Sequence, residues 1–361
     1  MRNIVFTGGG TAGHVMPNIA LFRALADEGW SIHYIGSQNG IERDIINGLE
    51  GYGPIPFYGI SAGKLRRYFD PQNFKDPFRV LKGIWQSFRL IRRIRPDLVF
   101  SKGGFVSVPV VVAARLSGVP VIIHESDLTP GLANRIAMPF ATRICATFPE
   151  TMDHLPRGKA VLTGSPIRGE LLSGDADAGR RLCGFVRTKP TLLVMGGSLG
   201  SQAINRAVRD ALDALLKRVQ IVHICGKGHL DPALEGRPGY RQFEFAGAEL
   251  ADLLAMADAA VSRAGANAIF ELLAAEKPML LIPLSRRASR GDQILNAASF
   301  EKRGFCLTLQ EEHLTPDNLV RHVDDLLDKR EDIRRRMREA AGRTGNEAIL
   351  ALIRECAAGR R

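Results

Sequence analysis

The chain is short of cysteine, and the cysteines that it has are not grouped. Among 361 residues there are five, with no C-x-x-C pair and no cluster. This spacing suits neither a zinc site nor a disulfide framework, so we expect a reducing cytoplasm and no bound metal. A D-x-D sequence at residues 175–177 has no strand before it, and we interpret it as a solvated loop or helix cap rather than a metal anchor. The cysteines are Cys145, Cys183, Cys225, Cys306 and Cys356.

Long hydrophobic runs are missing as well. The longest apolar stretch, residues 105–125, is divided by Arg115, Gly118 and two prolines into pieces of helix and strand length. The N-terminus, MRNIVFTGGG, has an apolar run of four residues, too short for the core of a secretory signal. We expect it to form a first strand, and we expect no transmembrane helix.

Acidic residues are outnumbered, and the imbalance is concentrated in one segment. The chain has 49 Lys and Arg against 38 Asp and Glu, and residues 64–95 alone hold ten basic residues against two aspartates, a net charge of +8. Apolar residues recur there at helical spacing, which predicts an amphipathic helix whose apolar stripe is mostly core. They are Phe78, Leu81, Ile84, Trp85, Phe88 and Ile91.

The same segment is a candidate membrane contact. A basic surface beside aromatic side chains is attracted to an anionic bilayer, by about 1 kcal/mol per Lys or Arg near the surface. Nucleic acid would be attracted by the same charge, but the sequence has no recognition-helix, RNP or zinc-finger pattern. We therefore expect residues 64–95 to contact an anionic membrane, and we expect no nucleic-acid partner.

Strand and helix patterns alternate along the chain. They run from NIVFT at the N-terminus to PVIIHE near residue 125, and they restart near Pro190 with TLLVMGGSLGS. This alternation is typical of a parallel, doubly wound α/β sheet. We predict two Rossmann-like domains, residues 1–163 and 164–361, that face each other across a substrate-binding cleft. The last helix is a candidate to pack back on the first domain.

The stretch TGGGTAGHVMPN, residues 7–18, has the G-x-G-x-x-G spacing of a dinucleotide-binding loop. Two signals that such loops need are missing. The next strand ends in Ser37-Gln38, where an acidic residue should bind the ribose, and no Gly-Lys-Ser/Thr follows the glycines as in a P-loop. We expect a turn that lets a ligand approach the backbone near a helix N-terminus. His14 is a candidate base there, and the alternative is a capping or packing histidine.

Four features of the second half predict a sugar-nucleotide site. A second glycine loop, GGSLGS at residues 196–201, can cradle a diphosphate, with a hydroxyl from Ser198. Arg168, at the domain junction, can pair with phosphate. Glu271, one turn into a helix, can accept bonds from ribose hydroxyls, unless it is an ordinary first-turn glutamate. Gln293, at the start of the next helix, can bind a sugar hydroxyl.

Seven stretches that together span nearly the whole chain resemble the MurG family of bacterial peptidoglycan synthesis. Members of that family are UDP-N-acetylglucosamine:lipid I N-acetylglucosaminyltransferases with the two-domain glycosyltransferase-B fold. The stretches are, in order, GGTAGHVMPN, KGGFVSVP, HESDLTPGLANR, GSPIR, GGSLGS, SRAGANAIFE and GDQILNA.

The resemblance implies a donor site for UDP-N-acetylglucosamine in the C-terminal domain. By similarity, Ser198 and Arg168 belong to the diphosphate region and Glu271 to the ribose. Gln293 matches a position at the sugar hydroxyls, and Ala246 one whose backbone borders uracil.

The resemblance also implies roles for the N-terminal domain. Thr11, Ala12 and Gly13 match a loop that faces the donor sugar and the acceptor, and His14 matches the candidate base of the family. Family members bind the cytoplasmic face of the cell membrane as peripheral proteins through a basic and apolar patch, which corresponds to residues 64–95.

The implied reaction is an inverting transfer. The 4-hydroxyl of N-acetylmuramic acid in undecaprenyl-diphosphate-linked lipid I attacks the anomeric carbon opposite the departing UDP, which gives lipid II. The candidate bases are His14 first, then Glu125 and Asp127, and no tightly bound cofactor is expected. Asp127 departs from the family, because many relatives have His-Glu-Gln-Asn where this chain has His-Glu-Ser-Asp, and Ala12 replaces a more usual glycine.

Two other interpretations fit parts of the sequence. One is another glycosyltransferase-B enzyme, such as a lipid glycosyltransferase or a UDP-N-acetylglucosamine 2-epimerase. The other is a non-catalytic subunit that only binds the UDP-sugar. The occurrence of both half-sites on one chain argues against the second.

Overall fold

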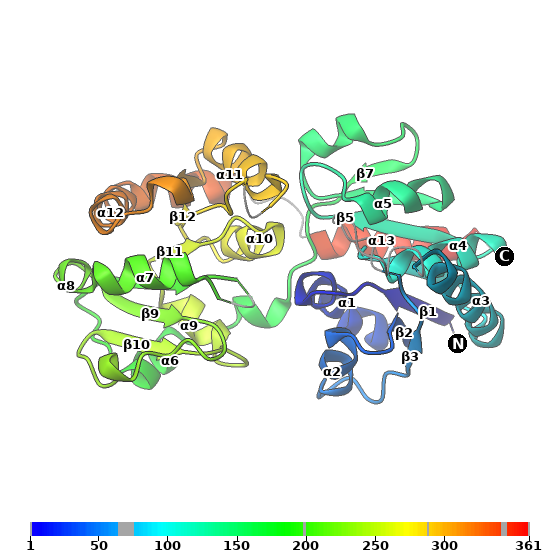
Figure 1. Cartoon of the computed structure of the whole chain (residues 1–361), viewed down its shortest axis with the longest axis horizontal. Helices are drawn as coiled ribbons and strands as arrows, with labels where there is room; N and C mark the ends of the chain where they lie inside the picture. Colours follow the sequence, from blue (N-terminus) through cyan, green and yellow to red (C-terminus); the bar gives the residue numbers. More distant parts are fainter. Residues whose placement is uncertain (1, 64–75, 198–199, 287–288, 341–344, 360–361) are drawn as a thin grey trace. The chain divides into compact units, whose positions relative to one another are not determined.

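The structure is a computed structural model of the chain and describes residues 2–63, 76–197, 200–286, 289–340 and 345–359 (Figure 1). The chain forms two compact units. The first is built from Met1–Arg168 together with Arg343–Arg361, and the second from Gly169–Gly342.

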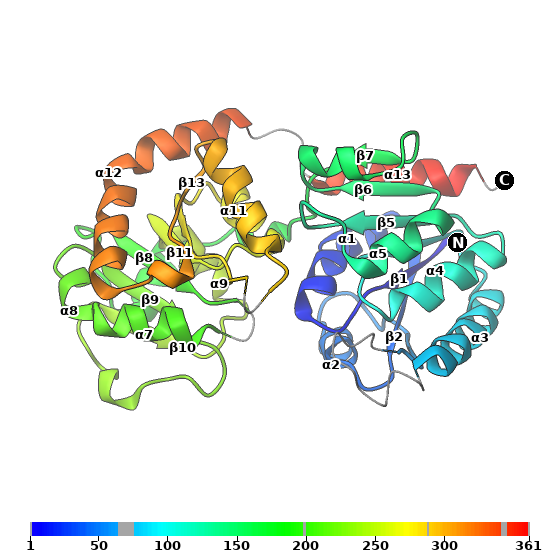
Figure 2. The same ribbon diagram turned by 45° about the horizontal axis from the view of Figure 1, so that its top comes forward.

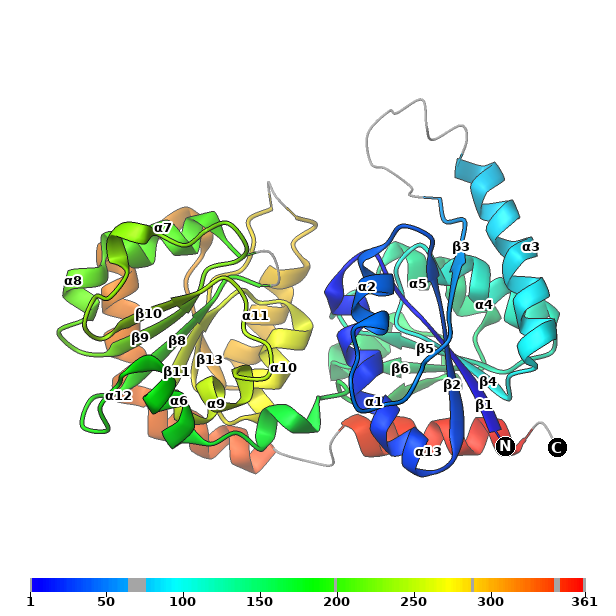
Figure 3. The same ribbon diagram turned by 90° about the horizontal axis from the view of Figure 1, so that it is seen from below.

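The first unit contains a seven-stranded parallel sheet in the order β3-β2-β1-β4-β5-β6-β7. Alternate residues of β1 (Arg2–Thr7), an interior strand, enter cores on opposite faces, Ile4 and Phe6 on one and Val5 on the other. Figure 3 shows α1 and α13 on one side of this sheet and α3 and α4 on the other. Because both faces are covered, the strands are almost continuous apolar runs, which is why the sequence pattern predicted a parallel sheet.

The strands are β1 (Arg2–Thr7), β2 (Trp30–Ser37), β3 (Phe57–Ile60), β4 (Leu98–Ser101), β5 (Val121–Glu125), β6 (Arg143–Ala146) and β7 (Ala160–Leu162). The α-helices are α1 (Met16–Asp27), α2 (Ile41–Asn47), α3 (Asp76–Ile94), α4 (Ser107–Leu116), α5 (Leu132–Ala137) and α13 (Gly345–Ala358), and short 3₁₀ turns are η1 (Ala12–His14), η3 (Met138–Phe140) and η4 (Pro149–His154).

The last helix, α13, belongs to the first unit, and its apolar face is buried in the same core as β1. At its start, the Asn346 side chain accepts a bond from Ile167 N and donates one to Ile167 O, both at 2.8 Å. Gly345 approaches Ser165 so closely that a Cβ would lie 2.1 Å from its carbonyl oxygen. These contacts hold residues 164–168 in the first unit. The units therefore divide after Arg168, and not between residues 163 and 164 as we expected. From residue 343 to the end, the chain again belongs to the first unit.

The second unit contains a six-stranded parallel sheet in the order β10-β9-β8-β11-β12-β13 (Figure 2). In each sheet the strand order reverses beside the first strand, between β1 and β4 and between β8 and β11, and ligands bind beyond the carboxyl ends of the strands at such reversals. The prediction of two Rossmann-like domains is confirmed. The strands are β8 (Thr191–Met195), β9 (Gln220–Ile224), β10 (Tyr240–Phe243), β11 (Ala259–Ser262), β12 (Met279–Leu281) and β13 (Cys306–Thr308). The α-helices are α6 (Ala176–Cys183), α7 (Gln202–Asp210), α8 (Leu212–Leu215), α9 (Leu250–Met256), α10 (Ala266–Ala274), α11 (Asp292–Lys302) and α12 (Pro316–Ala340), with 3₁₀ turns η5 (Gly169–Leu172), η6 (Pro232–Leu234) and η7 (Glu311–His313).

The basic amphipathic helix predicted within residues 64–95 is α3, and residues 64–75 lie outside the described part of the chain. The expectation that most of its apolar stripe is core is wrong. Phe78, Leu81 and Trp85 are exposed by 74%, 63% and 58%. The helix instead buries a narrow face that includes Gly83, where a Cβ would lie 2.2 Å from the Ser61 carbonyl oxygen. Among the described helices, none is both long and apolar enough to cross a membrane.

Candidate active site

The loop after β1 carries the first group of predicted residues. The chain turns through the glycines into η1, and α1 begins at Met16. The His14 ring is held by a 3.0 Å bond between its Nδ1 and the Thr11 hydroxyl, and Ala12 and Gly13 are half-buried beside it. Burial and, to a smaller extent, the nearby charge of Lys102 lower the pKa of His14, Glu42 opposes this shift, and the net pKa is about 4. The imidazole is therefore neutral at physiological pH. In the tautomer whose Nδ1–H donates to Thr11, Nε2 has a free lone pair and can accept a proton.

Glu42 fills the inner side of this loop. Its carboxylate accepts bonds from Gly10 N at 3.3 Å and from Ser37 N at 2.7 Å, and it also pairs with the Ser37 hydroxyl. A Cβ at Gly9 would lie 2.5 Å from Glu42 Oε1, so any other residue there would displace the Glu42 carboxylate. The loop thus satisfies its own amide with a carboxylate of the protein. This is a physical reason, beyond the missing ribose acid, why the G-x-G-x-x-G spacing does not form a dinucleotide site.

Glu125 anchors the loop after β5. It is 3% exposed, and its carboxylate accepts bonds from Asp127 N and Gly131 N, each at 3.0 Å, and from Asn134 Nδ2 at 2.8 Å. Burial raises the pKa of the Glu125 carboxyl, and these three donors counteract the increase. The geometry favours Glu125 as the anchor of the loop over Glu125 as a base. Asp127 is half-buried in the same loop.

A buried lysine completes this edge of the sheet, and the sequence reasoning missed it. Lys102, directly after β4, places its ammonium 2.6 Å from His124 Nδ1 and against the Ser126 hydroxyl. His124 Nε2 lies 3.0 Å from the carbonyl oxygen of Gly164. Lys102 also lies beneath the first loop, where a Cβ at Gly8 would be 3.2 Å from Lys102 Cβ. A lysine that directly follows a buried apolar strand was the signal that could have found it.

The loop after β8 in the second unit is the predicted diphosphate cradle. Ser198 lies outside the described residues. Gly200 has φ +77°, and a Cβ there would lie 2.0 Å from the Cys225 carbonyl oxygen. Ser201 caps α7 by accepting a bond from Ile204 N. The α7 N-terminus is thus a fixed set of backbone donors, which suits an anion.

Arg263, 7% exposed after β11, ties three loops of the second unit together. Its guanidinium donates to Ser201 Oγ at 2.7 Å and to Ile282 O at 3.1 Å, and it forms an ion pair with Glu311. Glu311 in turn accepts a bond from Ser285 N at 3.1 Å. These bonds fix the edge of the sheet from which the predicted donor-binding residues extend.

The predicted donor residues of the second unit lie on the helices and loops at this edge. Glu271 is half-buried and lies past the first turn of α10, so the alternative of a first-turn glutamate does not apply. Gln293 is the second residue of α11, and its side-chain oxygen accepts a bond from Leu284 N at 3.0 Å. Ala246 is buried in the loop after β10. Arg168 is half-buried at the last position of the first unit before the chain enters the second.

The D-x-D sequence caps a helix. Asp175 is the N-cap of α6 and accepts a bond from Asp177 N at 2.8 Å, while Asp177 pairs with Arg180 at 2.7 Å and with Arg187. The helix-cap interpretation is confirmed. Within the described residues, no group of three or more His, Cys, Asp and Glu side chains is arranged to hold a metal ion.

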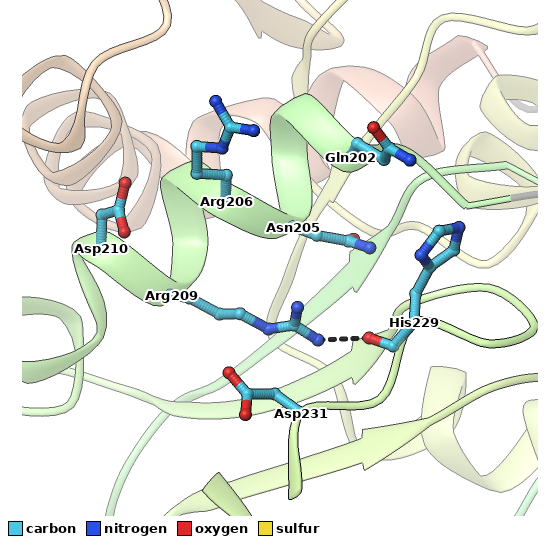
Figure 4. A pocket seen from close by; sticks show the side chains of 7 residues that line it. All are labelled: Gln202, Asn205, Arg206, Arg209, Asp210, His229 and Asp231. Atoms are coloured by element: carbon cyan, nitrogen blue, oxygen red, sulfur yellow. Dashed lines mark hydrogen bonds between the residues drawn. The ribbon is translucent and has the colours of Figure 1, made fainter. Parts of the chain in front are cut away.

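An open pocket of about 330 Å³ lies beside α7 and contains none of the predicted site residues (Figure 4). The guanidinium of Arg209, which is half-buried there, donates to the carbonyl oxygen of His229 and to Gln242 Oε1 at 2.9 Å. Its lining consists of Gln202, Asn205, Arg206, Arg209, Asp210, His229 and Asp231.

Comparison with known families matches both halves of the chain. Residues 4–146 match the glycosyltransferase family 28 N-terminal domain, and residues 191–351 match the glycosyltransferase family 28 C-terminal domain. The two matches fall on the two sheets described above.

Similar proteins align over nearly the full length. A protein of Geobacillus thermodenitrificans, named UDP-N-acetylglucosamine--N-acetylmuramyl-(pentapeptide) pyrophosphoryl-undecaprenol N-acetylglucosamine transferase, is 58% identical over 356 residues, 99% of each chain. A Bacillus cereus protein with the same name and the suffix 2 is 53% identical and covers 98% of this chain and 100% of its own. The crystal structure of Acinetobacter baumannii MurG superposes with a TM-score of 0.77 at 25% identity, covering 98% of this chain and 100% of that one.

Proposed function

The chain belongs to glycosyltransferase family 28 and, within it, to the MurG family, and from this premise we propose the reaction that it catalyses. It transfers N-acetylglucosamine from UDP-N-acetylglucosamine to the 4-hydroxyl of N-acetylmuramic acid in undecaprenyl-diphosphate-linked lipid I. The product is lipid II for peptidoglycan synthesis. The observation that carries this proposal is the 58% identity over 99% of both chains to a transferase of that name.

The first unit supplies the base. His14 accepts the proton of the attacking hydroxyl at Nε2 while Thr11 holds its Nδ1. Its low pKa keeps the imidazole unprotonated throughout the physiological range and also makes it a weaker base, so the role is supported by the fixed orientation of the ring. Glu125 and Asp127 support the base indirectly, since the Glu125 carboxylate is occupied by three donors and orders the loop that carries Asp127.

Residues of the second unit, together with Arg168 of the first unit, hold the leaving group. Amides at the N-terminus of α7, Ser198 and Arg168 stabilise the charge that develops on the UDP diphosphate, usually the largest contribution to catalysis. Glu271 accepts bonds from the ribose hydroxyls, Gln293 binds the sugar, and the Ala246 backbone borders uracil. The buried network around Arg263 supports this assignment, because it fixes the α7 N-terminus before the donor binds.

The protein acts at a membrane surface. α3 presents Phe78, Leu81 and Trp85 to solvent together with basic residues such as Arg89, whose guanidinium lies 4.8 Å from the Trp85 ring centroid. Exposed aromatic and cationic groups on one helix suit the anionic interface of a bilayer. Because lipid I is anchored in the bilayer, we place the enzyme peripherally on the cytoplasmic face, with α3 as its contact.

Incubation of the purified protein with radiolabelled UDP-N-acetylglucosamine and lipid I, followed by extraction of the lipid, tests the reaction. We expect label in the lipid phase and free UDP in the aqueous phase. Label that stays on the unchanged nucleotide sugar would identify a silent binding subunit. Conversion to the 2-epimer without acceptor would identify an epimerase.

A further inference from the structure

Asn18 is a fully buried polar residue that the proposed mechanism has not used. It is the third residue of α1, directly after the first glycine loop and His14, and it is 0% exposed. Burying an amide is unfavourable unless its polar atoms find hydrogen-bond partners. The partners of Asn18 therefore indicate what it does for the loop before it.

The Asn18 amide nitrogen joins the two ends of this loop. Nδ2 lies 3.3 Å from Thr7 O, where β1 ends, and 3.3 Å from His14 O, where the loop leads into α1. The same atom lies 3.3 Å from the Tyr34 hydroxyl on β2. The opposite orientation of the amide would point Oδ1 at two carbonyl oxygens, so the acceptors themselves fix the side chain.

The bond to His14 O has a local cause in the sequence. In a helical turn, a carbonyl oxygen accepts from a backbone N–H three or four residues later. The residue three after His14 is Pro17, which has no N–H. The backbone N–H of the next residue, Asn18, donates to Val15 O at 3.0 Å. The Asn18 side chain therefore supplies the donor for His14 O.

Tyr34 extends the same network to the first glycine. Its hydroxyl is fully buried and donates to Gly8 O at 2.7 Å, so its oxygen accepts from Asn18. Burial raises the pKa of the Tyr34 hydroxyl above its usual value, which keeps the proton that this bond needs. Gly8 also packs closely on the end of the loop, because a Cβ there would lie 2.7 Å from His14 O. One connected set of bonds thus holds Thr7, Gly8 and His14 together.

The Asn18 side chain carries a cost that packing alone does not explain. Among the residues that the structure describes, its Oδ1 is buried and has no hydrogen-bond partner. An apolar side chain of similar size would avoid the cost of this unpaired oxygen. Unpaired buried polar groups are expected where function requires them, and here the paired end of the amide orders the backbone beside the candidate base.

We propose that Asn18 and Tyr34 are positioning residues for the transfer: they hold the two ends of the first glycine loop and thereby the backbone from which His14 meets the attacking hydroxyl. The inference rests on the proposed function, because the reaction it serves is the glycosyl transfer. Both side chains act through backbone carbonyls and need not touch a substrate. Glu42 holds the middle of the same loop at Gly10 N, and the Asn18–Tyr34 pair holds its ends.

Steady-state kinetics of two substitutions test the proposal. Asn18→Leu removes both amide hydrogens with a side chain of similar shape, and we expect kcat to fall by about 10- to 100-fold. Tyr34→Phe removes one bond, to Gly8 O, and should lower kcat by about 3- to 10-fold. The KM for UDP-N-acetylglucosamine should stay within about twofold, because neither change alters the residues assigned to the UDP part of the donor. An unchanged kcat in both variants would overturn the proposal.

Stability separates positioning from a purely structural role. Asn18→Leu also removes the unpaired Oδ1, which offsets part of the loss of the two donors. We therefore expect the denaturation midpoint of the first unit, followed by tryptophan fluorescence, to change little while kcat falls. A loss of activity that only follows the unfolded fraction would contradict the proposal. If Asn18→Leu does not fold, Tyr34→Phe removes a single oxygen and allows the same comparison.

Two matched controls lie in the same sheet, away from the loop. Tyr58→Phe removes a hydroxyl of β3 that lies 3.5 Å from His33 Nδ1. Asn3→Leu removes an amide that donates to Ile94 O at 3.2 Å, near the start of β1. We expect both to leave kcat unchanged. If they lowered kcat as much as Tyr34→Phe and Asn18→Leu do, the effect would be general to polar bonds of this sheet and the proposal would fail.

A second readout does not depend on activity. In protein labelled with ¹⁵N at histidine, the shifts of the ring nitrogens report which nitrogen carries the proton, and the signals absent from His14→Asn are those of His14. We expect Asn18→Leu to move these signals and Asn3→Leu to leave them, because the bond between Thr11 and Nδ1 depends on the loop.

The two readouts distinguish failure of the inference from failure of the proposed function. If the wild-type protein transfers no sugar but Asn18→Leu moves the His14 signals, the proposed function fails while the hold of Asn18 on the loop stands. If wild-type transfer is normal and neither kcat nor the His14 signals respond to Asn18→Leu and Tyr34→Phe, the inference fails alone.

Discussion

At the scale of single residues, His14 combines a neutral ring with a fixed orientation. We expect His14→Asn to lower kcat by about 10²- to 10⁴-fold, the usual contribution of a general base. KM for the donor should change little, because the substitution alters none of the residues assigned to the UDP part of the donor. Thr11→Val, which removes only the bond to Nδ1, should cost less. Near-normal turnover by His14→Asn in the lipid I assay would show that His14 is not the general base.

The pH dependence of the same residue provides a further check. The pKa of His14 in the folded protein, about 4, lies below the ordinary 6.5. The ring therefore keeps its free lone pair at pH values above about 4 and becomes protonated only below that pH. We expect kcat/KM, which reports the pKa of the free enzyme, to stay level from pH 8 down to about 5 and to fall at more acidic values. If activity instead fell with a midpoint near pH 6.5, the catalytic histidine would be solvated, contrary to the buried site described above.

The sequence revealed His14 but not Lys102 or Glu42, for a reason that lies in strand register. His14 is recognisable because it follows a glycine turn after a strand. The positions of the other two depend on pairing: Thr7 lies opposite Ser101 of β4 and opposite Ile35 of β2. This register sets Lys102 and Glu42 beside the glycines, and no local pattern specifies it.

At the scale of elements, α2 and the first glycine loop depend on one carboxylate. Glu42→Ala leaves Gly10 N and Ser37 N without their acceptor. We expect the unfolding free energy of the first unit to fall by about 1–3 kcal/mol, the cost of unpaired buried donors, and kcat to fall with it. Both tryptophans, Trp30 and Trp85, lie in this unit, so fluorescence during denaturation reports on it alone.

Asp44→Ala is the matched control for Glu42→Ala, because Asp44 is an exposed acid on the same helix. We expect it to change stability by less than about 0.5 kcal/mol. Equal effects of the two substitutions would mean that Glu42 does not anchor the loop.

The helix α3 shows where periodicity alone misleads. An apolar stripe at helical spacing fits core packing and membrane contact equally well. Which face of α3 is buried depends on the small residues Gly83 and Ser87. They let the helix bury a narrow face and leave Trp85 exposed.

We expect the double substitution Leu81→Glu with Trp85→Glu to weaken binding to phosphatidylglycerol vesicles by about tenfold or more, since it removes apolar burial and adds negative charge. Sedimentation with vesicles measures this, and wild-type binding should weaken as salt increases. Leu230→Glu, at a similarly exposed leucine of the second unit, is the control and should leave binding unchanged. Vesicle binding that is indifferent to the α3 changes would locate the membrane contact elsewhere.

At the scale of the whole molecule, the sequence predicted two parallel α/β units because each is a run of buried strands with helical connections. It did not determine which sheet the last helix covers, since an amphipathic helix can cover either. Asn346 and Gly345 make that choice through their contacts with Ile167 and Ser165. The two residues joined by the Asn346 bonds are 179 positions apart in the sequence.

A test of this arrangement is Ile353→Ala in the buried face of α13. We expect it to lower the unfolding free energy of the first unit by about 2–5 kcal/mol, as is usual for a large-to-small change in a core. The tryptophan signal should report the loss. Leu326→Ala on α12, equally buried but in the second unit, should leave that signal unchanged. The reverse result would assign α13 to the other unit.

The return of α13 also sets an order of events at the ribosome. The strand β1 is made first and the helix that covers it last, with Gly169–Gly342 synthesised between them. At about 5–20 residues per second, the interval from the end of β1 at Thr7 to the start of α13 at Gly345 lasts roughly 17 to 70 seconds. During that time α13 does not yet cover the apolar face that bears Ile4 and Phe6. A chaperone that holds nascent chains can bind this face. A premature stop codon near the 3′ end would release a polypeptide without α13, which would be prone to aggregate.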